Sequence, residues 1–260
     1  IMNRPNTEIK RWGIAVVQSL TSKDKKTGEE LYNDVLRYKC YCKKESYSSF
    51  HNVTSIEEFY SAIKEIEKSL LEGDILTLQI ECHGCEDGIV LSDGEILKWR
   101  KFYDMIRPLN IKIGHLLFVA MAMCQSIAMI STINPEKRAP YRAFICTTRD
   151  VTSDEIYRGF LAFYKYYFNL LDIPKSLKAI QDETKDKYGK SPFQVLSAES
   201  VFEETLDSSR DISDLVIKQL ERLNIPITED NMSCMYNKIC KILTHLHEQY
   251  YEYYNFKDLY

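Results

Sequence analysis

The sequence predicts an α/β fold with a central, mostly parallel sheet and helices on both faces. Three runs of residues, 11–20, 75–82 and 114–123, are predominantly apolar and do not alternate in polarity, which is typical of parallel strands buried on both faces. Amphipathic helical segments lie between them, as the crossover connections between parallel strands require. With 260 residues, 45% of them hydrophobic, the chain can build a sizeable core.

The first predicted strand spans residues 11–20 (RWGIAVVQSL). In the loop that follows, three lysines mix with acidic residues that include Asp24, a composition typical of a solvated surface. Residues 35–41 (VLRYKCY) alternate in polarity, which predicts a strand nearer the sheet edge. Ser55 and Glu58 form a capping-box pattern ahead of a predicted helix, and the strand ending at Cys82 comes next.

Asp93-Gly94 predicts the turn of a small hairpin within residues 88–97. A helix is expected over residues 98–109, ending near Pro108, and the strand 114–123 follows it. Residues 141–148 (YRAFICTT) read as another buried strand. A second capping-box pattern, Thr152 to Glu155, begins a strongly amphipathic helix.

Pro174 suits the first turn of a further helix, which we expect to run through Tyr188 and stop at Gly189. Residues 193–197 predict an edge strand. Two helices are then expected, over 212–223 and 230–254. The sequence thus predicts an α/β domain over residues 1–205 and a helical C-terminal extension over residues 206–260.

The composition argues against several classes of protein. A net charge of −4 and a pI of about 5.8 argue against direct nucleic-acid binding, which usually needs an electropositive face. The sequence begins with no secretory signal and contains no apolar run long enough for a membrane span. Eight cysteines stand mostly inside apolar runs, so we expect a reduced, cytoplasmic protein without disulfides, metal or cofactor.

Two apolar runs end in residues that can carry out chemistry. Residues 75–82 are followed by His83 and Gly84, and residues 114–123 are followed by Cys124. Chemistry in open α/β sheets gathers at the carboxyl ends of the strands. A thiol before a helix N-terminus can act as a nucleophile, an imidazole can donate a proton, and a glycine amide can approach an oxyanion closely. These residues predict a Cys–His catalytic pair.

The same features, in the same order, resemble the caspase-like cysteine peptidases of clan CD, which include caspases, metacaspases, separase, gingipains and bacterial CHAT proteases. The segments CQS, AFICTT, TSDEIYRGFLAFYKYYF and SLKAIQDETKDKYGKSPFQVLSAE resemble CHAT proteases most. The resemblance covers residues 10–205. Caspases carry Gln-Ala-Cys, whereas Met121-Ala122-Met123 precedes Cys124 here, so caspase-type aspartate specificity is not expected.

The resemblance implies a caspase-like fold and a cysteine endopeptidase. It assigns Cys124 as nucleophile, His83 as general acid/base, and the amides of Gly84 and Cys124 as the oxyanion hole. It also implies a protein substrate cut at limited sites and an activating protein partner or sensor. Its likeness to small CHAT-like proteases further implies a place in prokaryotic antiviral defence, where such proteases process a gasdermin or a CRISPR-associated effector.

Three acidic residues are candidates for substrate binding, because a carboxylate at a pocket floor favours a basic P1 side chain. They are Asp150 and Asp154, after the predicted strand of residues 141–148, and Glu81, before the histidine. A P1 pocket lined by apolar groups is an equal alternative. The loops 85–94 and 134–140 would border the substrate groove.

Two other classes of function stay open. The first is a catalytically silent scaffold of the same fold that binds a protein partner. The second is a zinc-stabilised interaction domain, since Cys82, His83 and Cys85 adjoin and Cys40 and Cys42 could add ligands. Against zinc, Cys82 and His83 should point to opposite faces of a strand, and no C-x2-C or H-x3-H pair accompanies them.

Overall fold

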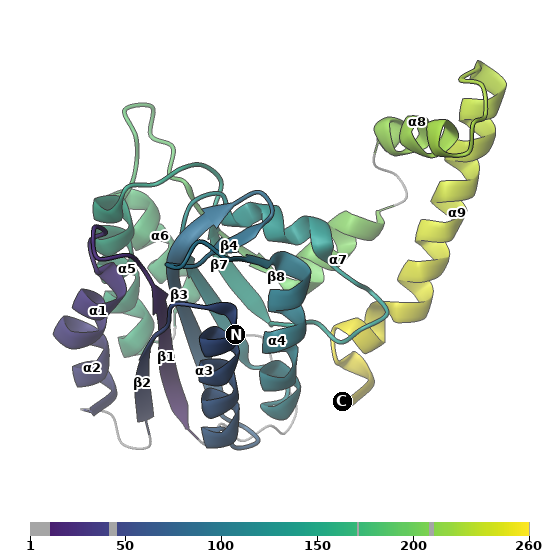
Figure 1. Ribbon diagram of the computed structural model, residues 1–260. Helices are drawn as coiled ribbons and strands as arrows, with labels where there is room; N and C mark the ends of the chain where they lie inside the picture. Colours follow the sequence, from purple (N-terminus) through teal and green to yellow (C-terminus); the bar gives the residue numbers. More distant parts are fainter. Residues whose placement is uncertain (1–10, 42–45, 171, 208–210, 260) are drawn as a thin grey trace.

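A computed structural model describes residues 11–41, 46–170, 172–207 and 211–259. Its centre is a mostly parallel sheet in the order β2-β1-β3-β6-β7-β8, with helices on both faces (Figure 1). This confirms the predicted α/β class. The strands are β1 (Trp12–Ser19), β2 (Ser46–Asn52), β3 (Ile75–Cys85), β4 (Gly88–Val90), β5 (Ile96–Lys98), β6 (Leu117–Ala122), β7 (Ala143–Thr147) and β8 (Phe193–Ser197).

The helices are of three kinds. Those of α type are α1 (Thr27–Leu31), α2 (Arg37–Tyr41), α3 (Ile56–Ser69), α4 (Trp99–Lys112), α5 (Ser153–Leu170), α6 (Ile173–Glu183), α7 (Ala198–Leu206), α8 (Ser213–Arg222) and α9 (Glu229–Tyr254). A π-helical segment, η1 (Tyr32–Leu36), joins α1 to α2, and η2 (Ser126–Thr132) and η3 (Lys257–Leu259) are 3₁₀ helices.

The strand pairing brings the chemistry-bearing ends together. β1 runs parallel to β2 and to β3, β3 runs parallel to β6, and β6 runs parallel to β7. Only the edge strand β8 runs antiparallel to its neighbour β7 in this path. The hairpin of β4 and β5 continues from the end of β3, with the predicted turn at Asp93-Gly94. The carboxyl ends of β1, β3, β6 and β7 therefore share one edge.

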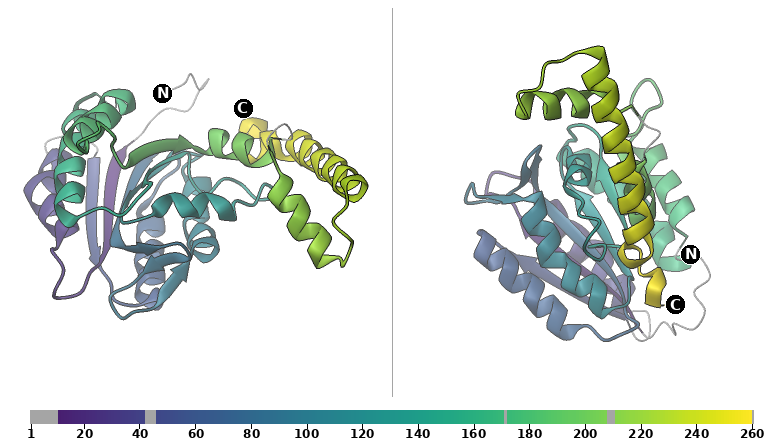
Figure 2. Two further views of the ribbon diagram at one scale, coloured as in Figure 1. Left: turned by 90° about the horizontal axis from the view of Figure 1, so that it is seen from above. Right: turned by 90° about the vertical axis from the view of Figure 1, so that its right-hand side faces the viewer.

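The core lies on both sides of the sheet, which explains the continuous apolar runs. On β1, Ala15 and Val17 pack with α3 and α4, whereas Ile14 and Val16 pack with α2 and α5. Figure 2 shows the sheet between these two helical layers when it is seen from above. Because alternate side chains of a strand point to opposite faces, a strand covered on both sides needs apolar residues throughout.

The strand predicted over residues 35–41 is wrong, because this segment is helical in η1 and α2. Its buried residues, Leu36 and Cys40, lie four apart and so share one helix face. The edge strand is β2 instead, whose sequence SYSSFHN is too polar to stand out as a strand.

Two predicted helix ends also differ from the structure. α4 continues past Pro108 to Lys112, with Leu109 and Asn110 buried in its last turn. α6 ends at Glu183, before the predicted stop at Gly189. Gly189 instead sits in a turn at φ +77°, a backbone conformation that glycine adopts readily.

The C-terminal helices project from the sheet, and their last residues return to its core (Figures 1 and 2). α8 and α9 form a small apolar cluster of their own. After α9, Phe256 is buried and stacks on the ring of His115, with 4.5 Å between centroids. Arg138 donates to the Tyr253 carbonyl and pairs with Asp258. The division at residue 206 stays a prediction, but the end of the extension belongs to the domain core.

We expect Phe256→Ala to destabilise the protein by about 3 kcal/mol or more, since it opens a cavity in the core. Leu259→Ala is the matched control, because Leu259 is 57% exposed whereas Phe256 is 1% exposed. The control should stay within about 0.5 kcal/mol of wild type. Urea unfolding measures both variants, and equal stabilities would show that the C-terminal residues do not contribute to the core.

Candidate active site

The pairing of β3 with β6 sets the site. The last pair of this ladder joins Glu81 to Ala122, and His83 and Cys124 each follow two residues later in the chain. His83 lies at the exposed end of β3, where the strand leaves the central sheet to pair with β4. Cys124 lies two residues beyond the end of β6 and is half-buried. The two residues predicted to form the catalytic pair therefore come from adjacent strand ends.

Gly84 lies against the backbone of Cys124. A Cβ atom at Gly84 would stand 2.2 Å from the Cys124 carbonyl oxygen, a distance that no side chain can occupy. Glycine is thus required here for close packing of two backbones. The contact joins the His-Gly strand end to the cysteine loop, so His83, Gly84 and Cys124 form one locality.

The thiol of Cys124 is held by the loop after β7. The Val151 N–H faces its sulfur at 3.4 Å, and the thiol donates to the Val151 carbonyl at 3.6 Å. Gln125, the next residue, has φ +51°, and the 3₁₀ helix η2 begins at Ser126. The helix expected after the cysteine is therefore present as one 3₁₀ segment.

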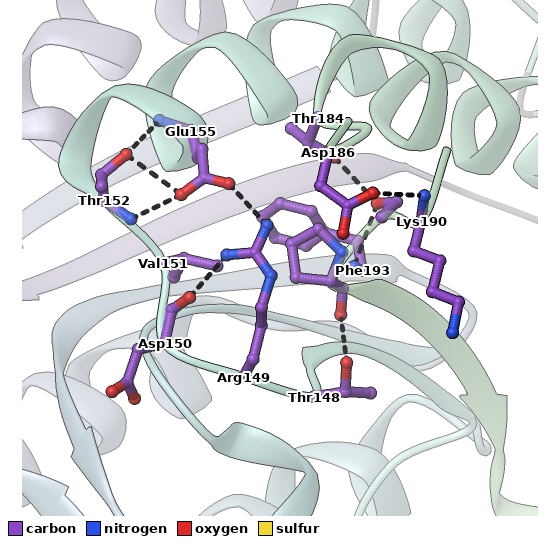
Figure 3. Close-up of polar contacts among 12 residues, drawn as sticks. Thr148, Arg149, Asp150, Val151, Thr152, Glu155, Thr184, Asp186, Lys190 and Phe193 are labelled. Atoms are coloured by element: carbon purple, nitrogen blue, oxygen red, sulfur yellow. Dashed lines mark hydrogen bonds and ion pairs between the residues drawn. The ribbon is translucent and has the colours of Figure 1, made fainter. Parts of the chain in front are cut away.

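The loop after β7 is itself tied down on two sides (Figure 3). Thr152 and Glu155 form the predicted capping box of α5, and Arg149 donates to Glu155 at 2.8 Å. On the other side, the Thr148 N–H donates to the Pro192 carbonyl at 3.0 Å. These contacts hold the Val151 backbone against the cysteine, and sequence reasoning did not single out Val151 because a backbone contact leaves no residue-type signal.

The imidazole of His83 pairs with a residue that sequence reasoning left in a solvated loop. Its Nε2 lies 3.2 Å from Oδ1 of Asp24, in the connection between β1 and α1. Within the described part of the chain, no hydrogen bond joins His83 to the Cys124 thiol. One feature of the sequence could have pointed to Asp24. Thr21 and Asp24 stand three residues apart directly after the first predicted strand, a spacing typical of a turn closed by side-chain hydrogen bonds.

Glu81 lies in the core and not on a surface that a substrate reaches. Its side chain is 1% exposed and accepts hydrogen bonds from Thr27 Oγ1 and Gln79 Nε2, both at 2.7 Å. Burial raises its pKa to about 7, an effect that these two hydrogen bonds oppose. In this structure the Glu81 carboxylate is therefore occupied within the core, and its role in substrate binding stays a prediction.

Asp150 and Asp154 lie on the same edge as the cysteine. Asp150 accepts from the side chain of Gln125 at 2.9 Å, which places it beside the cysteine loop. Asp154 is exposed in the first turn of α5 and pairs with Lys25 at 3.7 Å and with Arg158 at 3.4 Å. Their roles in substrate binding stay predictions.

The cysteines around His83 do not assemble as metal ligands in the described residues. Cys82 is buried, and burial raises the pKa of its thiol, whereas His83 points outward on the next residue. Cys40 is buried on α2, and Cys42 lies outside the described residues. Across the described ranges, no group of three or more His, Cys, Asp or Glu side chains has a metal-binding arrangement.

No protein-family model matches the sequence, and the comparison with curated proteins gives no match either. Among solved structures, protein GSU0716 from Geobacter sulfurreducens is similar, with a TM-score of 0.44 and 14% identity. The match covers 71% of this chain and 93% of that one. At this level the likeness carries no argument about function. Of the helices that the structure describes, none has the length and apolar character needed to cross a bilayer.

The pKa of Glu81 predicts a pH dependence of stability. Since its pKa in the folded protein is raised, its contribution to stability is full below pH 4.5 and is lost as the pH rises towards 7. Glu81→Gln removes this titration while keeping the side-chain shape. We expect the stability of the variant relative to wild type to rise by on the order of 3 kcal/mol between pH 4.5 and 8.

Urea unfolding at both pH values measures this difference. Glu221→Gln is the control, because Glu221 is an exposed carboxylate on α8. It should change the pH dependence little. A Glu81→Gln variant that loses equal stability at both pH values would show that folding does not raise the pKa of Glu81.

Proposed function

We propose that the protein is a cysteine endopeptidase in which Cys124 is the nucleophile and His83 the general acid/base. The observation that carries this proposal is the backbone contact of Gly84 with Cys124, which joins the His-Gly strand end to the cysteine loop. A thiol and an imidazole at adjacent strand ends, with a glycine amide beside them, are the groups that acyl transfer to sulfur needs.

In the proposed reaction, His83 takes the thiol proton of Cys124, the sulfur attacks the scissile carbonyl carbon, and the π electron pair of the carbonyl moves to its oxygen. The amides of Gly84 and Cys124 are the proposed donors to that oxyanion. As the C–N bond breaks, the His83 imidazolium gives its proton to the leaving amine. Water then attacks the thioester and loses a proton to His83, which releases the acid and restores the thiol.

The substrate is proposed to be a protein cut at limited sites, with Asp150 and Asp154 available to a basic P1 side chain at the edge beside Cys124. An activating protein partner, a cytoplasmic location and a part in prokaryotic antiviral defence belong to the same proposal. The partner and the defence role rest on the resemblance of the sequence to CHAT proteases, and the location rests on the cysteines within apolar runs.

A silent scaffold is the alternative that an observation favours. His83 pairs with Asp24 and the Cys124 thiol with Val151, so the two catalytic groups have other partners than each other. In caspase-like peptidases this separation is expected in the resting enzyme, which is why the peptidase stays the first proposal.

The test is cleavage of a proteome-derived peptide library, with new N-termini read by mass spectrometry. We expect wild type to produce a consistent set of cuts, and Cys124→Ala to lose them. His83→Asn should reduce the rate by roughly 100-fold or more. The library reports the P1 residue together with the activity.

Cys234→Ala is the matched control, because Cys234 is an exposed thiol on α9. It should cut like wild type. Cleavage that persists in Cys124→Ala would refute the assignment of the nucleophile. Wild type that cuts nothing, alone or with a lysate of its source cells added, would favour the scaffold.

A further inference from the structure

Asp24 contacts one of the proposed catalytic groups, His83, and has no part in the proposed mechanism. Its Oδ1 lies 3.2 Å from His83 Nε2. The Asp24 side chain is 25% exposed and that of His83 is 56% exposed, so the pair sits at the surface of the strand edge. Most exposed ion pairs hold their side chains loosely, so the question is whether Asp24 is held in place.

Thr21 holds Asp24 in place. The other carboxylate oxygen, Oδ2, accepts from the Thr21 N–H at 2.8 Å and from the Thr21 hydroxyl at 2.7 Å. The Asp24 N–H donates to the Thr21 carbonyl at 3.1 Å, and Lys26 Nζ donates to the same carbonyl at 2.7 Å. The hydroxyl of Thr21, first, and the contact with His83 lower the pKa of Asp24, so it is an anion near neutral pH.

The loop that carries Asp24 is anchored at both ends. On one side, Ser19 at the end of β1 accepts from the Ser92 N–H at 2.9 Å. On the other side, Thr27 at the start of α1 donates to the buried Glu81. Asp24 therefore has one carboxylate oxygen bound by its own loop and the other directed at the histidine.

The geometry points to Asp24 as a positioning residue for His83, which makes the proposed dyad a Cys–His–Asp arrangement. The carboxylate accepts the Nε2–H of the imidazole and so fixes the tautomer in which Nδ1 has no proton. Nδ1 is then the nitrogen that takes the Cys124 thiol proton and passes it to the leaving amine. Asp24 stays ionised and balances the imidazolium charge. This inference rests on the proposed function.

Asp24→Asn tests it, because the loop dictates how the new amide must lie. The Thr21 N–H needs an acceptor, so the amide oxygen replaces Oδ2 and the NH₂ group turns towards His83 Nε2. Nε2 must then accept, and the ring proton moves to Nδ1, the wrong nitrogen for the reaction. When an asparagine replaces the carboxylate beside a catalytic imidazole, the reaction slows because the histidine is held in this unreactive tautomer.

Histidine ¹⁵N NMR spectra read the tautomer directly, and His83→Gln assigns the signal. We expect the Nε2–H form in wild type and the Nδ1–H form in Asp24→Asn. For the best-cut peptide of the library, kcat should fall roughly 10- to 100-fold with little change in KM. Asp24→Glu, which keeps the carboxylate, should retain the Nε2–H form, and its spectrum also tests whether changes at residue 24 disturb folding.

Asp182→Asn is the matched control, because Asp182 is a surface carboxylate on α6 that pairs with Lys185. It should leave both the spectrum and kcat unchanged. An unaltered His83 tautomer in Asp24→Asn overturns the inference, even if the wild type cuts peptides. A tautomer that changes as expected in a protein without peptidase activity supports the role of Asp24 and refutes the proposed function.

Discussion

The close approach of Gly84 to the Cys124 carbonyl is the contact on which the rest of the site depends. It follows from the parallel pairing of β3 with β6, whose residues are buried from both sides. A slip of one residue in such a ladder would turn every side chain to the wrong face. The relative placement of His83 and Cys124 is therefore fixed by core packing, and it requires no bond between the two side chains.

A buried polar network lies on β3 directly before the candidate site. Tyr164 on α5 donates to Gln79, Gln79 donates to Glu81, and Thr27 on α1 also donates to Glu81. Buried polar groups are stable only when they are paired, so this network links β3 to helices on one face of the sheet. Because Thr27 follows the loop of Asp24, the network also fixes one end of that loop.

Much of the fold, and the placement of His83 and Cys124 at neighbouring strand ends, followed from the sequence, because apolar runs indicate burial and their ends indicate the sheet edge. The sequence did not predict β2, because its half-exposed, Ser-rich residues form no apolar run. Asp24 escaped for another reason: its partner lies 59 positions away, at His83, and local composition describes only the charged loop around it. Glu81 drew attention because a carboxylate in an apolar run looks functional, and only the structure reveals its buried partners Thr27 and Gln79.

The two proposed catalytic groups are held by different loops, and this bears on how the proposed activity could be controlled. His83 is paired from the loop after β1, and Cys124 is paired from the loop after β7. The second loop continues into α5 through the Thr152 capping box. A partner that moves the first turn of α5 would move Val151 with it and release the thiol, while Asp24 would keep the imidazole oriented. Activation by such a partner would then act on the nucleophile and leave the acid/base group in place.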